Sequence, residues 1–152
     1  MASVPPSRSF MQLALDEARA AAARGEVPVG CVIVRDGEVV ARAGNRTLAD
    51  RDPTGHAELI AIRAAARALG SERLTDCDLY VTLEPCAMCA AALSFARVRR
   101  LYFGATDPKG GAVDNGVRFF GSPSCHHRPE VYGGIGESEC ASLLKDFFQA
   151  RR

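Results

Sequence analysis

Four residues in two short motifs have the types and spacing of a catalytic metal site. His56 and Glu58 form a His-Ala-Glu motif, and Cys86 and Cys89 belong to a Pro-Cys-Ala-Met-Cys motif that starts 27 residues after Glu58. A structural zinc site uses four protein ligands, whereas a catalytic site uses three and leaves the fourth position to water. One histidine and two cysteines therefore predict a catalytic zinc site.

The chemistry that this set predicts is hydrolysis. Bound zinc lowers the pKa of water from about 16 towards about 7, so hydroxide is available at neutral pH. Because Glu58 lies close to His56 in the sequence, we expect its carboxylate to take the water's proton and to return it to a ring nitrogen and then to a leaving amine. Attack on an amidine-like carbon with loss of ammonia is hydrolytic deamination, and the two motifs together are typical of nucleobase deaminases.

Other interpretations of the cysteine pair are open but less well supported. A Cys-x-x-Cys pair also occurs in redox proteins and in structural zinc sites. A redox pair has no need of the upstream His-x-Glu motif. A structural site needs a fourth ligand, for which Cys125, His126 and His127 are the candidates further along the chain. A zinc-dependent binding module without catalysis has no need of Glu58.

Two predicted helices bring the motifs together. His56 and Cys86 each stand at the start of a periodic, Ala-rich segment, and Pro85 is expected at the first position of the second of these helices. Cys86 and Cys89 are spaced i, i+3 and share one helical face. The partial positive charge of a helix N-terminus favours their thiolate forms.

The remaining elements predict one α/β domain over residues 1–152. Asp36-Gly37 is typical of a hairpin turn. We expect a first helix between Phe10 and Gly25, later helices over 57–69, 86–95 and 137–150, and strands over 29–34, 38–43, 78–83, 98–103 and 130–132. Their order predicts a three-layer helix-sheet-helix fold with a five-stranded mixed sheet, in which the hairpin is antiparallel and the strand-helix-strand units are parallel.

Composition fits a globular chain and excludes several classes. The 152 residues are 47% hydrophobic and 24% charged, with a net charge of +1, which argues against a disordered tail, a coiled coil or a strongly basic nucleic-acid binder. No apolar segment approaches the roughly 20 residues that cross a bilayer, and no signal peptide is evident. We therefore expect a cytoplasmic protein without a membrane role, in which the cysteines stay reduced.

Although the net charge of the chain is only +1, one segment has a local excess of positive charge. Residues 97–128 contain six basic side chains against two acids, Asp107 and Asp114. This segment predicts either an RNA-facing patch or an ordinary solvated surface. The four remaining cysteines are expected to have no role, with Cys31 and Cys140 on apolar faces and Cys77 and Cys125 in loops.

Beyond the zinc motifs, the chain resembles the bacterial tRNA-specific adenosine deaminases of the cytidine deaminase superfamily from about Phe10 to Ala150. The zinc motifs indicate only the superfamily, and further segments indicate the tRNA branch. These segments are Glu26-Val27-Pro28-Val29-Gly30, Gly44-Asn45-Arg46, Asp52-Pro53-Thr54-Gly55, Val81-Thr82-Leu83-Glu84, Phe103-Gly104-Ala105, Lys109-Gly110-Gly111-Ala112, His127-Arg128 and Asp146-Phe147-Phe148.

The resemblance implies a cytidine-deaminase-like fold, a homodimer, and one Zn²⁺ per subunit. It also implies conversion of adenosine to inosine at the wobble position of a tRNA anticodon stem-loop. His56, Cys86 and Cys89 would then bind zinc, and Glu58 would carry protons. A deaminase of free bases or nucleosides, such as guanine or cytosine, shares the same zinc core and is the alternative.

The resemblance also implies substrate contacts. Asn45 would hydrogen-bond the flipped nucleoside, and an exposed aromatic residue would stack on a splayed base. Phe147 is expected to pack inside the protein and Phe148 to face outwards. His126 stands where the family often has Asn before the His-Arg pair. The full set of expected substrate contacts is Asn45, Val27, Pro28, Arg46, His126 and Phe148.

Overall fold

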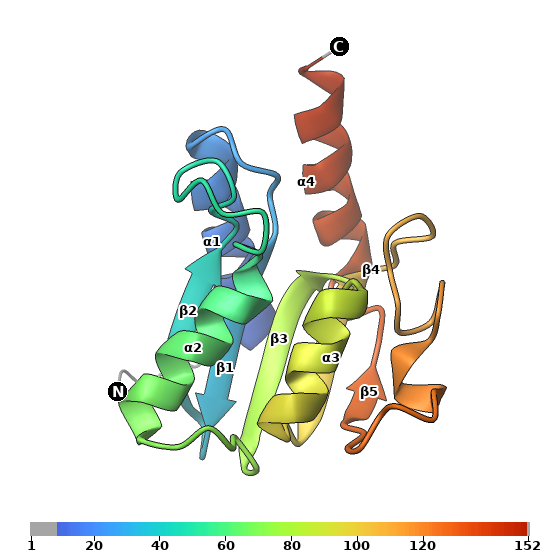
Figure 1. Ribbon diagram of the computed structural model, residues 1–152. Helices are drawn as coiled ribbons and strands as arrows, with labels where there is room; N and C mark the ends of the chain where they lie inside the picture. The colour runs from blue at the N-terminus through green and yellow to red at the C-terminus, as the bar shows by residue number, and fades with distance from the viewer. Residues whose placement is uncertain (1–8, 152) are drawn as a thin grey trace.

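The computed structural model describes residues 9–151, whose helices lie on both faces of a single sheet (Figure 1). Every predicted helix and strand is present in this part of the chain, with ends that differ by one or two residues. In chain order the elements are α1 (Phe10–Ala23), β1 (Gly30–Arg35), β2 (Glu38–Gly44), α2 (Ala57–Leu69), β3 (Cys77–Leu83), α3 (Ala87–Ala96), β4 (Arg100–Ala105), the 3₁₀ turn η1 (Phe119–Gly121), β5 (Glu130–Tyr132) and α4 (Glu137–Gln149).

The sheet has the strand order β2-β1-β3-β4-β5. β1 runs antiparallel to both β2 and β3, whereas β3, β4 and β5 are parallel to one another. Asp36 and Gly37, between β1 and β2, have φ angles of 52° and 77°, the positive values that a two-residue type I′ hairpin turn requires. The predicted five-stranded mixed sheet is confirmed.

Helices cover both faces of this sheet, because successive side chains of a strand point to opposite sides. Cys31 and Ile33 of β1 belong to the core shared with α2 and α3, while Val32 and Val34 belong to the core shared with α1 and α4. In Figure 1, α2 and α3 lie in front of the sheet and α1 lies behind it. The three-layer architecture is confirmed.

The last helix, α4, packs against β4 and β3 and then continues beyond the edge of the sheet (Figure 1). Cys140 is its buried contact near Gly104, where an added Cβ would overlap the Cys140 sulfur. As predicted, Phe147 is buried and Phe148 faces outwards, with 52% of its surface exposed. Among the helices of the described residues, none combines the length and the apolar content needed to cross a membrane.

The start of α3 differs from the prediction. The helix begins at Ala87 with Cys86 in extended conformation as its N-cap, so Pro85 precedes the helix instead of opening it. The Pro85 carbonyl accepts a hydrogen bond from the Ala112 N–H at 2.9 Å. This contact holds Pro85 against a distant loop.

The starts of β4 and β3 also differ from the prediction. β4 begins at Arg100 instead of Val98, because the Val98 N–H donates to the Leu93 carbonyl in the turn that ends α3. Cys77, expected in a loop, is the fully buried first residue of β3.

At the N-terminus, Ser9 caps α1 through a reciprocal pair of hydrogen bonds with Gln12. Ser7, the other candidate cap, lies outside the described residues.

Candidate active site

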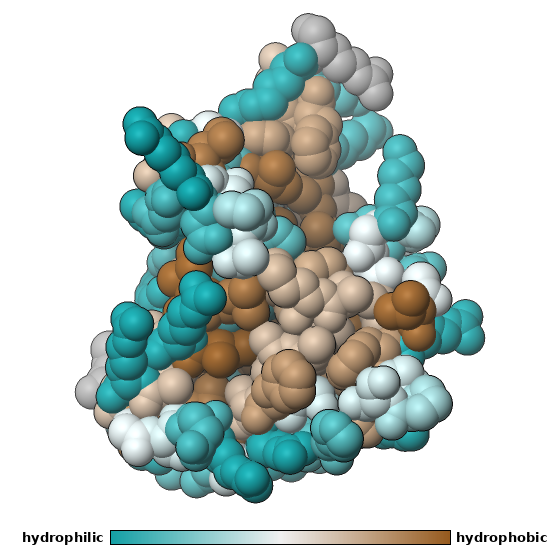
Figure 2. Space-filling view, viewed as in Figure 1, coloured by the Kyte–Doolittle hydropathy of each residue, from teal (hydrophilic) through white to brown (hydrophobic). Residues whose placement is uncertain are grey.

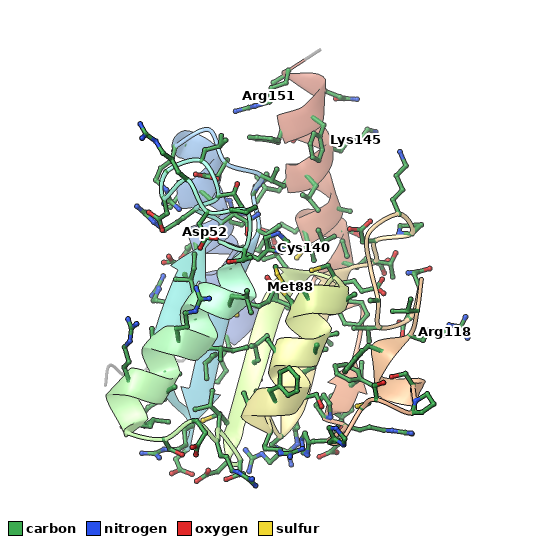
Figure 3. The ribbon with its side chains drawn as sticks, viewed as in Figure 1. Asp52, Met88, Arg118, Cys140, Lys145 and Arg151 are labelled. Atoms are coloured by element: carbon green, nitrogen blue, oxygen red, sulfur yellow. The ribbon has the colours of Figure 1, made fainter. Side chains whose placement is uncertain are left out.

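The two zinc motifs meet at one end of the sheet. β2, β3 and β4 run in the same direction, so the segments that follow them all emerge at this end. In Figure 3 it is the upper end, where Asp52 lies in the loop before α2 and Met88 in the first turn of α3. His56 and Cys86 are the N-caps of α2 and α3, and neither side chain caps its own helix. Both side chains are therefore available as ligands.

The three expected zinc ligands already have the spacing that zinc requires. The His56 Nδ1 atom lies 3.6 Å from the Sγ atoms of both Cys86 and Cys89, and the three ligand atoms lie within 4.8 Å of one another. Zinc bonds of about 2.3 Å to sulfur and about 2.1 Å to nitrogen, at tetrahedral angles, separate N from S by roughly 3.6 Å. The donor set therefore fits zinc, and three protein ligands leave one coordination position open.

The three ligand side chains share protons through hydrogen bonds, and their pKa values shift in different directions. The hydrogen bond with Cys89 lowers the pKa of the Cys86 thiol to about 4, and His56 contributes in the same direction. The same bond, together with burial, raises the pKa of Cys89. The hydrogen bond to Cys86 also raises the pKa of His56. A dication that binds here displaces these protons, because its ligands must be deprotonated.

Glu58 stands in the first turn of α2 and faces the same pocket as His56 and Cys86. Only 4% of its surface is exposed. Burial raises the pKa of its carboxyl group to about 7, although its own backbone N–H opposes this shift. A carboxyl group with such a pKa can take up and release a proton near neutral pH, as a general acid–base catalyst must.

The pocket beside these residues has a volume of about 350 Å³, within the usual range of small-molecule sites. Three apolar side chains, those of Val27, Val29 and Leu83, form an apolar part of its lining, and most of the other lining residues are polar. The lining residues are Val27, Val29, Asn45, Thr47, His56, Glu58, Leu83, Glu84, Cys86, Asp107 and Gly110.

Asn45 both caps α2 and lines this pocket. Its Oδ1 accepts a hydrogen bond from the Ala57 N–H at 2.9 Å, so it caps α2 in place of His56. The amide NH₂ group is left as the donor that the side chain offers to the pocket. Asn45 can therefore recognise a substrate atom that accepts hydrogen bonds.

A second cavity of about 510 Å³ adjoins the first and shares Val27, Leu83 and Asp107 with it. Its other lining residues are Thr106, Lys109, Leu144 and Phe148. The exposed Phe148 of α4 thus lines a cavity that adjoins the pocket of the expected zinc ligands.

Three expected contact residues do not line either cavity. Pro28 is buried behind its neighbours Val27 and Val29. Arg46 forms an ion pair with Asp50 at 3.2 Å. His126 is exposed and belongs to neither lining. These three contacts stay predictions.

The local excess of positive charge is partly neutralised by neighbours outside the segment. Arg99 and Arg100 both pair with Asp78, and Arg100 also pairs with Glu130. Arg118 projects outwards at the side of the molecule (Figure 3). These ion pairs favour the ordinary solvated surface for this part of the segment.

The sequence did not identify six of the lining residues as candidates, namely Val29, Thr47, Leu83, Glu84, Asp107 and Gly110. The only signal was indirect, because Leu83 and Glu84 belong to the segment before Cys86 and Asp107 and Gly110 to a glycine-rich loop. Of the four cysteines expected to have no role, Cys31, Cys77 and Cys140 are buried, and all four are free thiols.

Comparisons with known proteins agree with this geometry. Residues 6–105 match the family model of the cytidine and deoxycytidylate deaminase zinc-binding region. A tRNA-specific adenosine deaminase from Agrobacterium fabrum is 64% identical over 143 residues, which cover 94% of each chain. A solved structure from a study of A-to-I editing by tRNA:A34 deaminases is 65% identical, covers 89% of this chain and 98% of its own, and has a TM-score of 0.88.

A more distant structure, guanine deaminase from Bacillus subtilis, is 31% identical with a TM-score of 0.63 and covers 94% of this chain and 91% of its own. It has the same general fold, but its identity is about half that of the first two relatives. On the family model and the high identity over almost the full chain, this protein belongs to the tRNA-specific adenosine deaminase family, whose members contain the cytidine and deoxycytidylate deaminase zinc-binding region.

Proposed function

We propose that the protein catalyses hydrolytic deamination of adenosine to inosine at the wobble position of a tRNA anticodon, in the cytoplasm. The observation that carries this proposal is the three-ligand centre beside Glu58, in a chain 64% identical to a tRNA-specific adenosine deaminase. Residues 1–152 would act as one deaminase domain.

In this mechanism His56, Cys86 and Cys89 would hold zinc, which would supply a water molecule of lowered pKa. Glu58 accepts a proton from the water as the water oxygen bonds to C6, and it donates that proton to ring nitrogen N1 of the adenine. In a second transfer, Glu58 takes the remaining proton of the new C6 hydroxyl group and delivers it to the departing amine. The C6–N bond breaks and the water oxygen stays on C6. Adenosine and water thus give inosine and ammonia.

Asn45 and the apolar wall orient the base for this reaction. The Asn45 NH₂ group donates to an acceptor atom of the nucleoside, because its Oδ1 is engaged by the Ala57 N–H. Val27 and Val29 supply apolar surface on which a flat base packs. The adjoining cavity near Phe148 would receive a neighbouring nucleotide of the anticodon loop by stacking.

We also propose that the protein is a homodimer that pairs through α2 and α3. Figure 2 shows apolar side chains gathered over these two helices in the middle of the visible face. Phe95 is 72% exposed, and it borders a hollow also lined by Leu59, Ile62 and Ala92. An apolar patch of this kind is typical of an interaction surface. Sedimentation equilibrium of the purified protein would report the oligomeric state.

The second candidate function is deamination of a free base, which the resemblance to the guanine deaminase structure favours. That structure is 31% identical to this chain, and the same zinc-binding core is compatible with both substrates. Only the choice of substrate separates the two functions.

The test supplies the zinc-loaded protein with a tRNA anticodon stem-loop that carries adenosine at the wobble position. Parallel reactions contain free guanine or cytidine, and inosine and ammonia are measured in each. Inosine in the stem-loop without turnover of the small substrates supports the proposal. Turnover of guanine or cytidine with an unchanged stem-loop would overturn it.

A further inference from the structure

The loop of residues 106–116, which follows β4, forms a wall of both cavities. Asp107 and Gly110 line the catalytic pocket, and Thr106, Asp107 and Lys109 line the adjoining one. These residues are all described, and they form no helix or strand. Within the loop, Asp107 accepts hydrogen bonds from the N–H groups of Lys109, Gly110 and Gly111. Contacts from outside the loop fix its position relative to the cavities.

Glu84, the residue that follows β3, accepts five hydrogen bonds from this loop. Its Oε2 accepts from the backbone N–H groups of Val113, Asp114 and Asn115 at 3.0, 2.9 and 3.0 Å. Its Oε1 accepts from the Asp107 N–H at 3.0 Å and from the Asn115 side-chain amide at 2.7 Å. The residue is only 2% exposed. One buried carboxylate thus fastens both ends of the loop.

The loop also packs against Glu84 without free space. A Cβ on Gly111 would lie 2.6 Å from Glu84 Oε2, so only glycine fits at that position. Next to it, the Ala112 N–H donates to the Pro85 carbonyl at 2.9 Å. The wall is therefore attached to the same short backbone segment that carries Cys86.

We propose that Glu84 is a positioning residue for the substrate, because it fixes the 106–116 wall at a set place relative to the metal centre. This inference rests on the proposed function, in which the wall contacts the nucleotide. A carboxylate suits this role since two acceptor oxygens can receive five donors, whereas an amide has one acceptor oxygen.

The variant Glu84→Gln keeps the size of the side chain and removes one acceptor oxygen. In either orientation of the amide, its NH₂ group then faces N–H donors of the loop and cannot accept a hydrogen bond from them. Adding Asn115→Asp places a carboxylate at the other end of the 2.7 Å hydrogen bond between these two side chains. The amide at position 84 can then donate a hydrogen bond to that carboxylate. The double variant is expected to recover most of the substrate binding that Glu84→Gln loses, because only the Asp107 N–H is left without an acceptor.

The matched control is Asp78→Asn, at the other end of the same strand. Asp78 is also a largely buried carboxylate, with 13% of its side chain exposed, and it pairs with Arg99 and Arg100. Glu84 lies six positions further along the chain, which corresponds to about 20 Å at roughly 3.3 Å per residue. This change removes a carboxylate from β3 without touching the pocket wall.

The kinetic readout is kcat and KM on the stem-loop, with the zinc content of each sample measured. Glu84→Gln is expected to raise KM about tenfold or more while kcat changes less than about threefold, the pattern of lost substrate binding. Zinc content should stay at the wild-type value. Asp78→Asn should leave KM unchanged, and a fall in kcat and zinc content at constant KM in Glu84→Gln would overturn the inference.

The second readout, amide hydrogen exchange, does not depend on activity. Four backbone amides donate to Glu84, those of Asp107, Val113, Asp114 and Asn115. In Glu84→Gln, exchange should accelerate at the end of the loop that faces the new NH₂ group, either at Asp107 or at Val113, Asp114 and Asn115, and all four should stay at the wild-type rate in Asp78→Asn. Unchanged exchange at these amides would overturn the inference, even if the wild-type protein proved inactive on the stem-loop and the proposed function itself failed. If Glu84→Gln does not fold, Asn115→Ala removes one of the five donors and gives the same test with a smaller shift.

Discussion

Glu58 and Glu84 are both buried carboxyl groups that line the same pocket, and each lies two residues from an expected zinc ligand. Their surroundings are opposite. Burial raises the pKa of Glu58 to about 7. Burial acts in the same direction on Glu84, but hydrogen bonds from the Asp107 N–H and the Asn115 side chain outweigh it and lower the pKa of that carboxyl group.

The difference separates two functions within one pocket. A buried carboxyl group with few donors exchanges a proton readily, whereas one that is saturated with donors stays ionised and serves as an anchor. Changes at the metal corner, formed by His56, Glu58, Cys86 and Cys89, should therefore lower kcat or the zinc content. Changes at the walls should affect substrate binding or stability and leave the chemical step intact.

The largest effect is expected from His56→Ala, which removes one of three ligands. Zinc content should fall towards zero and deamination should become undetectable, a greater loss than the roughly 10–100-fold drop in affinity or activity that follows mutation of a residue behind the ligands. Metal analysis after dialysis checks this result. His127→Ala is the control, because His127 bonds to the Val98 carbonyl at 2.8 Å. Loss of zinc from that variant would indicate a four-ligand structural site instead.

An intermediate effect is expected from Asn45→Asp, at the junction of metal corner and wall. The carboxylate keeps the acceptor for the Ala57 N–H, so the thermal midpoint should change little. The donor to the substrate is lost, and kcat/KM should fall about 10–100-fold, which corresponds to about 1.4–2.7 kcal/mol for a buried acceptor left without its hydrogen bond. Asn45→Ala loses the helix cap as well and should cost about 1 kcal/mol of stability in addition. Equal activity of Asn45→Asp and wild type would refute the contact.

The smallest effect on activity is expected at Glu26, which anchors the loop after β2. Its carboxylate is 1% exposed and accepts hydrogen bonds from Thr47, Leu48 and Ala49. Burial raises the pKa of Glu26, but these hydrogen bonds outweigh it and lower the pKa below its ordinary value of 4.5. The stability that the ionised group contributes is therefore present above pH 4.5 and is lost as the pH falls through the lowered pKa.

Glu26→Gln should consequently lower the free energy of unfolding by about 1–3 kcal/mol at pH 7 and by less at acidic pH. Urea unfolding at several pH values measures this difference, and zinc content serves as the control for the metal corner. A constant difference between variant and wild type across the acidic range would contradict the role of the ionised Glu26.

The metal corner could be predicted from the sequence because its geometry is local. Cys86 and Cys89 are one helical turn apart, and His56 and Cys86 each precede a recognisable helix. The order of helices and strands was also sufficient to predict the mixed sheet. Local hydrogen bonds displaced the ends of some elements, as at Pro85, whose carbonyl is taken by Ala112.

The walls could not be predicted in the same way, because they depend on contacts between distant parts of the chain. Glu84 stands beside a zinc motif, but its hydrogen-bond partners lie 23 to 31 residues further along. No periodicity or spacing connects Glu84 with Asn115. Likewise, Val29 lines the pocket and Pro28 does not. This difference depends on the path of the chain between α1 and β1, which the sequence pattern does not specify.

The most direct test of the account is the rate of inosine formation by Glu58→Gln on the anticodon stem-loop, at a zinc content equal to that of the wild type. The glutamine side chain has the same length and shape as glutamate, but it cannot accept and release a proton near neutral pH. We expect full zinc content, a similar KM and a kcat reduced by about 10²–10⁴-fold. A metal-replete Glu58→Gln sample with wild-type kcat would contradict the assignment of Glu58 as the proton carrier.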